Sequence, residues 1–189
     1  MVEAMPLATR TSQPPAMREE ETRRNQFLTF ALGGEILAME IRFIREILQY
    51  GSITEVPLTP PAVRGFMNLR GAVIPVIDLS VRFGRPSAPV DRRTCIVILE
   101  VQEEENTTAM GVVVDYVREV LEIAESDIEP PPAFGNTLRN DFIRGVGRIS
   151  GRFVILLDVE HVLSAEELGT TDVDMRLTPS TSSTEPHLN

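Results

Sequence analysis

The sequence predicts a mainly β protein made of two small barrels related by a pseudo-twofold axis, with few short helices. Three observations lead to this fold class. The chain of 189 residues is 42% hydrophobic, lacks Trp and has 5% aromatic residues, so its core must consist of Val, Ile and Leu, which favour strands. Short apolar runs recur between breaks that contain Gly or Pro. In addition, one block of sequence occurs twice.

The first expected hairpin surrounds Gly33-Gly34. Apolar runs lie on both sides, at Phe27–Leu32 and Glu35–Ile41, and glycine reaches the positive φ values that a tight hairpin turn requires. The clearest helix start is Ser164-Ala165-Glu166-Glu167, where the Ser hydroxyl and the Glu carboxylate can satisfy end-turn amides. This helix would be short. Further strands are expected at Glu46–Tyr50, Ala72–Asp78, Thr94–Val101, Ala109–Val114 and Arg152–Leu157.

The internal repeat is the most informative feature. Phe43–Leu48 and Tyr116–Leu121 share the pattern aromatic, aliphatic, Arg, Glu, aliphatic, Leu at an offset of 73, and Val63-Arg64-Gly65 matches Ile143-Arg144-Gly145 at an offset of 80. Two copies of one β unit explain this register, while chance similarity between short apolar strands is the alternative. Each Arg-Gly pair is expected just before a hairpin, where a missing Cβ permits a turn or a close backbone approach. The offset of 80 also relates Gly71 to Gly151 and Asp78 to Asp158.

Four segments are expected along the chain. Residues 1–24 and 169–189 are rich in polar residues and Pro, which predicts disordered tails. The break at Gly84–Pro89 separates a first barrel at 25–92 from a second barrel at 93–168, which includes the short C-terminal helix. These boundaries are approximate, because strands can be exchanged between the barrels.

Composition argues against several classes of function. A net charge of −10 and a pI near 4.7 disfavour nucleic acid and anionic membranes, which are bound through Lys and Arg. No apolar stretch approaches the ~18 residues of a membrane-spanning helix, so no direct membrane insertion is expected. The single cysteine, Cys95, rules out an intrachain disulfide and fits the reducing cytoplasm. We expect it to act as a small buried hydrophobe.

The residues that could carry catalysis lack partners. His161 and His187 have no set of neighbours that would form a triad or a zinc site, and no phosphate-binding loop occurs. We therefore expect no catalytic residue, no cofactor and no metal. Asp78 and Asp158 could form an acid–base dyad, but capping of a helix or turn after each strand is the favoured interpretation. Glu46 and Arg70 are expected at the barrel surface, where an ion pair contributes about 0–1 kcal/mol.

Several motifs resemble the CheW family of chemotaxis adaptors. They are Ile44-Arg45-Glu46-Ile47, the segment Pro60–Leu79 with its Asn68-Leu69-Arg70-Gly71 turn, and, in the second half, Met110–Asp115 and Val117–Leu121. The resemblance covers about residues 26–168. It implies two intertwined five-stranded barrels of SH3-like or OB-like type, and a non-catalytic adaptor that couples chemoreceptors to a CheA-type histidine kinase.

The resemblance also implies partners and site residues. The regulatory domain of the kinase would bind mainly to the first barrel, where Ile44 and Gly65 match positions of kinase coupling, and Glu46 and Arg70 match positions of array function. The cytoplasmic tip of a methyl-accepting chemoreceptor would lie in the groove between the barrels. The residues expected in that groove are Val117, Val120 and Cys95, the last of which stands where an aliphatic residue is common.

The expected location is the cytoplasm, with recruitment to membrane-associated receptor arrays. Three alternatives remain open at this stage. The adaptor could serve an array that controls pili or a second messenger. The paired aspartates Asp78 and Asp158 could form an enzyme site. An OB-type barrel could bind nucleic acid, although the sequence lacks the basic groove and stacking aromatic residues that such barrels use.

Overall fold

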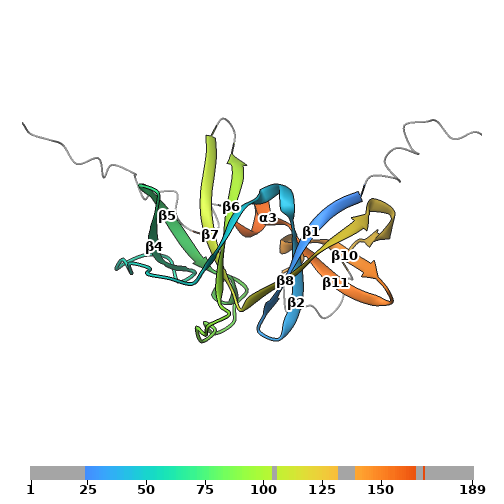
Figure 1. Cartoon of the computed structure of the whole chain (residues 1–189), viewed down its shortest axis with the longest axis horizontal. Helices are drawn as coiled ribbons and strands as arrows, with labels where there is room; N and C mark the ends of the chain where they lie inside the picture. The colour runs from blue at the N-terminus through green and yellow to red at the C-terminus, as the bar shows by residue number, and fades with distance from the viewer. Residues whose placement is uncertain (1–23, 104–105, 132–138, 165–167, 169–189) are drawn as a thin grey trace, which may run out of the picture.

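The computed structural model describes residues 24–103, 106–131, 139–164 and 168. Two β-sheets make up this part of the chain, with α3 between them (Figure 1). The predicted tails therefore lie outside the described residues, apart from Arg24. The five-stranded sheet has the order β3-β6-β7-β5-β4. Its strands are β3 (Ile44–Gln49), β4 (Val63–Leu69), β5 (Ala72–Asp78), β6 (Cys95–Glu103) and β7 (Asn106–Val114).

The other sheet has six strands in the order β8-β1-β2-β11-β10-β9. Five strands were predicted for each barrel, and the sixth is the two-residue β9 at one edge. Its strands are β1 (Arg24–Leu32), β2 (Glu35–Glu40), β8 (Tyr116–Ala124), β9 (Ile128–Glu129), β10 (Ile143–Ile149) and β11 (Arg152–Leu157).

The two halves of the chain exchange hairpins. The β1–β2 hairpin completes the sheet that contains β8–β11, and the β6–β7 hairpin completes the sheet that contains β3–β5. Neither the range 25–92 nor the range 93–168 therefore forms a barrel by itself. The expected intertwining is confirmed, because each sheet takes strands from both halves.

The strand pairing confirms the duplication. The strands that are equivalent by the repeat occupy equivalent places, so β3, β6, β7, β5 and β4 correspond in order to β8, β1, β2, β11 and β10. Both of the hairpins β4–β5 and β10–β11 carry a register shift, which lies at Gly65 in one and at Gly145 in the other. Chance similarity of short strands would explain neither the shared strand order nor the matching register shifts.

The prediction of the strands was incomplete. The segments of β4, β8 and β10 were not identified as strands, and Gly65 and Gly145 lie inside the first strand of each hairpin instead of before it. Polar residues within these strands obscure their apolar pattern. The turn at Gly33-Gly34 is confirmed, with φ values of 58° and 85°.

Short helices follow β5 and β11. Helix α2 (Leu79–Arg82) begins after Asp78, whose carboxylate accepts hydrogen bonds from the amides of Ser80 and Val81. Helix α3 (Val159–Val162) begins after Asp158, which accepts a hydrogen bond from the amide of His161. The predicted capping is thus confirmed at both aspartates. The helix predicted at Ser164–Glu167 falls on residues 165–167, which lie outside the described part. Within the described ranges, three short 3-10 helices complete the elements: η1 (Ile41–Phe43), η2 (Glu125–Asp127) and η3 (Asn140–Phe142).

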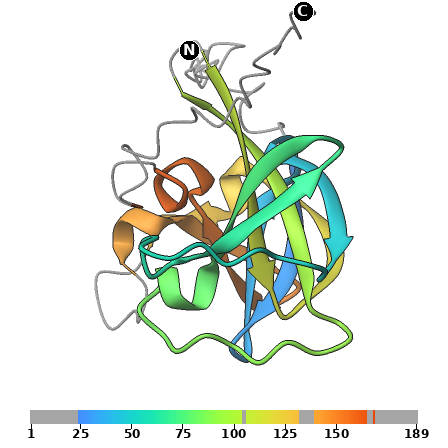
Figure 2. The ribbon, with the colours of Figure 1, turned by 90° about the vertical axis from the view of Figure 1, so that its left-hand side faces the viewer.

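Buried apolar residues form three clusters. One fills the six-stranded sheet, with Phe27 and Leu156 among its members, and another fills the five-stranded sheet, with Ile96 and Ile98. The third and largest, here called the central core, joins residues of both sheets to α2 and α3. Seen from the side of the five-stranded sheet, the two sheets lie one behind the other (Figure 2). The barrels therefore share a core and are expected to unfold together.

Candidate functional site

Glu46 and Arg70 form a two-point ion pair at the surface of the five-stranded sheet. The two guanidinium nitrogens Nη1 and Nη2 of Arg70 lie 2.7 and 3.0 Å from the carboxylate oxygens Oε1 and Oε2 of Glu46. The Glu46 side chain is 19% exposed and that of Arg70 is 68% exposed. Hydrogen bonding to Glu46, followed by its charge, raises the pKa of the Arg70 guanidinium above its ordinary value. The arginine therefore stays charged and presents its outer face to solvent.

The ion pair spans the two ends of the five-stranded sheet. Glu46 lies on β3, and Arg70 follows β4, the strand at the opposite end. The chain beyond β3 also reaches β4, because Thr54 and Phe66 exchange two backbone hydrogen bonds of 2.8 and 2.9 Å. The backbone pairing closes the sheet into a barrel, and the ion pair lies across the same closure.

A tight turn positions Arg70. Arg70 and Gly71 have φ values of 51° and 90°, the left-handed pair that a two-residue hairpin requires. The amide of Gly71 donates to Oδ1 of Asn68 at 3.0 Å, which holds the turn from within. The equivalent turn at Ser150 and Gly151 has φ values of 48° and 76°, so the duplication preserves the turn but not the arginine.

Gly65 is buried and has a structural role. A Cβ at this position would lie 2.4 Å from the carbonyl oxygen of Thr54 and 2.7 Å from a methyl group of Ile53, and the φ of Gly65 is 149°. Only glycine allows β4 to approach the segment that closes the barrel. Gly65 has no side chain through which to bind a partner, and its effects would pass through the backbone of residues 53 and 54.

Ile44 lies between the sheets. It is paired with Leu99, and Ile47 is paired with Val97 across a register shift. Residues that pair directly point to the same side of a sheet, and Leu99 and Val97 belong to the central core. Ile44 packs against that core, whereas Ile47 is 40% exposed at its margin. Ile47 was not predicted as a site residue, although the repeated motif contains it.

Val117 and Val120 have the same arrangement on the other sheet. Val117 is paired with Phe30 and Val120 with Leu28, again across a register shift. This irregularity places both valines on one side of β8, although they are three residues apart. Val117 packs against the central core and Val120 is 48% exposed. The rim of the central core is therefore aliphatic where β8 forms its edge.

Cys95 approaches the same core from the five-stranded sheet. It packs against the central core but is half-buried, whereas a buried residue was predicted, and its thiol donates to the carbonyl oxygen of Arg93. Of the three residues predicted for the inter-barrel groove, Cys95 and Val117 lie against this core. Val120 is paired with the buried Leu28 and is exposed to solvent.

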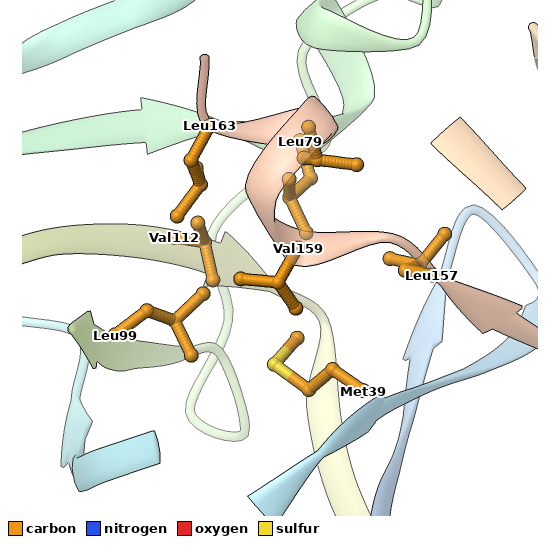
Figure 3. A pocket seen from close by; sticks show the side chains of 8 residues that line it. Met39, Leu79, Leu99, Val112, Leu157, Val159 and Leu163 are labelled. Carbon is orange, nitrogen blue, oxygen red and sulfur yellow. The ribbon is translucent and has the colours of Figure 1, made fainter. Parts of the chain in front are cut away.

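The structure has a small apolar cavity in its core and a wider depression at its surface. The cavity of about 10 Å³ inside the central core is lined only by apolar side chains, contributed by both sheets, α2 and α3 (Figure 3). A cavity of this volume is about the smallest that can hold one water molecule. A wider surface depression of about 360 Å³ is lined by Asn25, Gln26, Glu40, Ile41 and Arg42.

The titratable groups already have partners. Asp78 is 4% exposed, and in addition to its two amide bonds it pairs with Arg64 at 3.0 Å. Asp158 pairs with Nδ1 of His161 at 3.0 Å. Within the described ranges, no group of three His, Cys, Asp or Glu residues could hold a metal ion. None of the helices in those ranges has the length and apolar character needed to cross a bilayer.

Comparison with known proteins identifies the family of this chain. A family model described as CheW-like domain matches residues 26–167. The chemotaxis protein CheW of Klebsiella aerogenes is 36% identical over 152 residues, which cover 80% of this chain and 89% of that protein. The chemotaxis protein CheW of Rhizobium meliloti is 32% identical over 142 residues, which cover 75% and 89%.

A solved structure is also similar. The crystal structure of the scaffolding protein TtCheW from Thermoanaerobacter tengcongensis superposes with a TM-score of 0.66 at 29% identity, covering 82% of this chain and 93% of that chain. The match includes both sheets, since it extends over most of each chain. The chain therefore belongs to the CheW-like domain family.

Proposed function

We propose that this chain is a chemotaxis adaptor that couples chemoreceptors to a CheA-type histidine kinase through protein contacts alone. One observation supports the proposal: this chain of the CheW-like domain family carries an ion pair on one sheet and an aliphatic edge on the other, and the two sheets share one core. The first surface is the Glu46–Arg70 ion pair at the closure of the five-stranded sheet. The second is the aliphatic rim at Val117 and Val120.

The ion-pair surface suits the regulatory domain of the kinase. Arg70 is fixed by two hydrogen bonds to Glu46, yet its side chain is mostly exposed. A pre-positioned guanidinium can donate further hydrogen bonds to a partner's carboxylate or carbonyl groups without much additional loss of side-chain entropy. Ile44 and Gly65 would contribute indirectly. Ile44 packs β3 against the central core, and Gly65 lets β4 approach the segment that closes the barrel.

The aliphatic rim suits the helical tip of a receptor. A helix that lies in an apolar groove uses side chains spaced by three or four residues as anchors. Val120 supplies exposed apolar area at the margin of the central core, and Val117 and Cys95 continue that area inward. The helix would thus lie between the sheets. In this arrangement the adaptor works in the cytoplasm and is recruited to membrane-associated arrays by its receptor.

The proposal is tested by sedimentation of receptor-containing membranes with the full kinase and this chain. We expect the wild-type chain to bring the kinase into the pellet and to raise its autophosphorylation. Arg70→Glu should reduce the kinase in the pellet by about tenfold or more, because it places like charges side by side. It should still pellet with the receptor, since the rim is unchanged.

Arg148→Glu is the matched control. Arg148 lies just before the equivalent turn on the six-stranded sheet and pairs with Glu129. Arg148→Glu therefore reverses a charge in the same way as Arg70→Glu, but at a hairpin outside the proposed kinase surface. Kinase recruitment should be unaffected by this variant. The assignment of the surface is refuted if Arg70→Glu recruits and activates the kinase as well as the wild-type chain does.

A further inference from the structure

We propose that Arg82 and Arg85 brace the two barrels against each other and so position the aliphatic rim for the receptor. The inference rests on the proposed function for the identity of the partner. Arg82 ends α2, which follows β5 of the five-stranded sheet, and Arg85 comes three residues later. Both side chains pair with groups that belong to the other barrel, so this short segment joins one barrel to the other.

Arg82 binds the end of the opposite helix. Its Nε donates to the carbonyl oxygen of Val162 at 2.8 Å, and its Nη2 donates to that of His161 at 3.4 Å. The last carbonyl groups of a helix have no partner within the helix, and α3 ends at Val162. The guanidinium also lies over the buried ring of Phe142, 4.5 Å from the ring centre. An arginine of one barrel therefore completes a helix of the other.

Arg85 makes a second contact between the barrels. Its Nη2 lies 2.6 Å from Oε2 of Glu35, the first residue of β2 in the six-stranded sheet. The Arg85 side chain is 21% exposed, and its Nη1 would lie 3.2 Å from a Cβ added at Gly33 in the adjoining turn. Two contacts at separate places restrain the rotation of one barrel against the other as well as their separation.

The segment is also fixed to its own barrel. The carboxylate of Asp78 accepts hydrogen bonds from the amides of Ser80 and Val81 and from the hydroxyl of Ser87. The chain is thus held on both sides of the two arginines. In addition, the amide of Arg85 donates to the carbonyl oxygen of Ser80 at 2.9 Å. The two side chains therefore extend from a well-anchored backbone.

The duplication helps to separate this role from folding. By the offset of 80, Arg82 corresponds to Val162, so the contact joins two equivalent positions of the repeat. The six-stranded barrel folds with valine at this place, and folding of one β unit does not require an arginine there. Apolar burial in the central core is non-directional, whereas hydrogen bonds have preferred distances and angles. The arginine contacts therefore add a directional restraint to the shared core.

The angle between the barrels matters for the rim. Val117 and Val120 lie on β8 of the six-stranded sheet, and their equivalents Ile44 and Ile47 lie on β3 of the five-stranded sheet. Ile44 and Val117 both pack against the central core. A helix that contacts both edges meets two walls carried by different barrels, so its fit depends on the angle between them. A fixed angle lowers the entropy lost when the receptor binds.

Spin-label distances test the brace directly. Ala72 and Arg152 are the exposed first residues of β5 and β11 and correspond by the offset of 80. Replacing both with Cys in a Cys95→Ala background gives one label on each barrel. Arg82→Met should broaden or shift the distance distribution measured by electron–electron double resonance, because Met keeps an apolar side chain over Phe142 but donates no hydrogen bond. Arg82→Lys retains a donor and should lie closer to the wild type.

Affinities measured without the labels connect the brace to the receptor. Arg82→Met should bind receptor-containing membranes about three- to tenfold more weakly, because only a fraction of the molecules then has the binding orientation. Its affinity for the full kinase should stay within about twofold of the wild type, since the ion-pair surface lies on one barrel. Arg85→Met removes a partly exposed ion pair and should change distances and receptor affinity in the same direction, which decides the question if Arg82→Met does not fold.

Arg148→Met is the matched control. Arg148 pairs with Glu129 inside the six-stranded sheet, so both readouts should match the wild type. Unchanged distances in Arg82→Met and Arg85→Met overturn the inference while the proposed function stands. Weaker receptor binding at unchanged distances also overturns it, because the arginines would then contact the receptor themselves, and so do altered distances at unchanged receptor affinity. No binding of the receptor by the wild-type chain refutes the proposed function and the inference together.

Discussion

Replacing Gly65 with Ala tests how the five-stranded sheet is closed. The new Cβ would lie 2.4 Å from the carbonyl oxygen of Thr54, and since the atom it meets belongs to the backbone, no side-chain rotation can relieve the contact. Thr54 must move away from β4. We therefore expect the Thr54–Phe66 pairing to break, which opens the barrel between β4 and the segment that follows β3.

The size of the effect follows from two contributions. The two backbone hydrogen bonds between Thr54 and Phe66 contribute about 0.5–1.5 kcal/mol each. The φ of 149° at Gly65 adds about 1 kcal/mol when a Cβ is present. The free energy of unfolding should thus fall by about 2–4 kcal/mol, which lowers Tm by roughly 5–15 °C for a chain of this size.

Two matched variants separate these contributions. Gly71 has a φ of 90°, and a Cβ added there would have no neighbouring atom within 4 Å, so Gly71→Ala should cost about 1 kcal/mol from backbone conformation alone. At Gly145 no positive φ is found, but a Cβ would lie 2.8 Å from the carbonyl oxygen of Glu129. Gly145→Ala should cost about 1–3 kcal/mol from the close approach alone.

Urea unfolding followed by circular dichroism measures all three variants. Gly65→Ala is expected to be the least stable of the three, and hydrogen exchange should show loss of protection at the amides of Thr54 and Phe66. If Gly65→Ala unfolds within about 0.5 kcal/mol of the wild-type chain, the close approach does not hold the barrel shut. The structural role assigned to Gly65 would then be refuted as well.

Two further predictions concern the capping aspartates and the aliphatic rim. Asp158→Ala should lower the free energy of unfolding by about 1 kcal/mol, because it removes a helix cap. Asp78→Ala should lower it by about 2–4 kcal/mol, because it also leaves Arg64 without its buried partner. Urea unfolding measures both variants, and equal losses of stability would contradict this difference. Val120→Lys should reduce co-sedimentation with receptor membranes by about tenfold and change stability by less than about 0.5 kcal/mol. Val73→Lys, on an exposed position of β5, should leave receptor binding intact, and a normal Val120→Lys would count against the rim as the receptor surface.

Much of the fold could be predicted because the duplication repeats each local sequence pattern in both halves of the chain. The turn glycines, the capping aspartates Asp78 and Asp158, and the offset of 80 between the hairpins each depend on a few adjacent residues. Local backbone geometry determines such features. The strand β8 was not predicted, because Arg118 and Glu119 interrupt its apolar pattern.

The exchange of hairpins could not be predicted in this way. The β1–β2 hairpin has an apolar face that would suit either sheet. Its pairing with β8 joins residues about 90 positions apart, as with Thr29 and Glu119, and its pairing with β11 joins residues still further apart, as with Leu37 and Ile155. Propensity and periodicity identify a strand but do not select its partner. The structural role of Gly65 was hidden for a similar reason, since the Thr54 carbonyl that it meets comes from a loop without a strand signal.

The duplication also shows where the two barrels differ in chemistry. Glu119 corresponds to Glu46 by the offset of 73, but Ser150 corresponds to Arg70 by the offset of 80, so the six-stranded sheet has no ion pair at this place. A surface ion pair stabilises a fold by at most about 1 kcal/mol, and the equivalent turn folds without it. Closure of a barrel therefore does not require the pair. Under the proposed function, reversal of the charge at position 70 is therefore expected to weaken partner binding and to leave folding nearly unchanged.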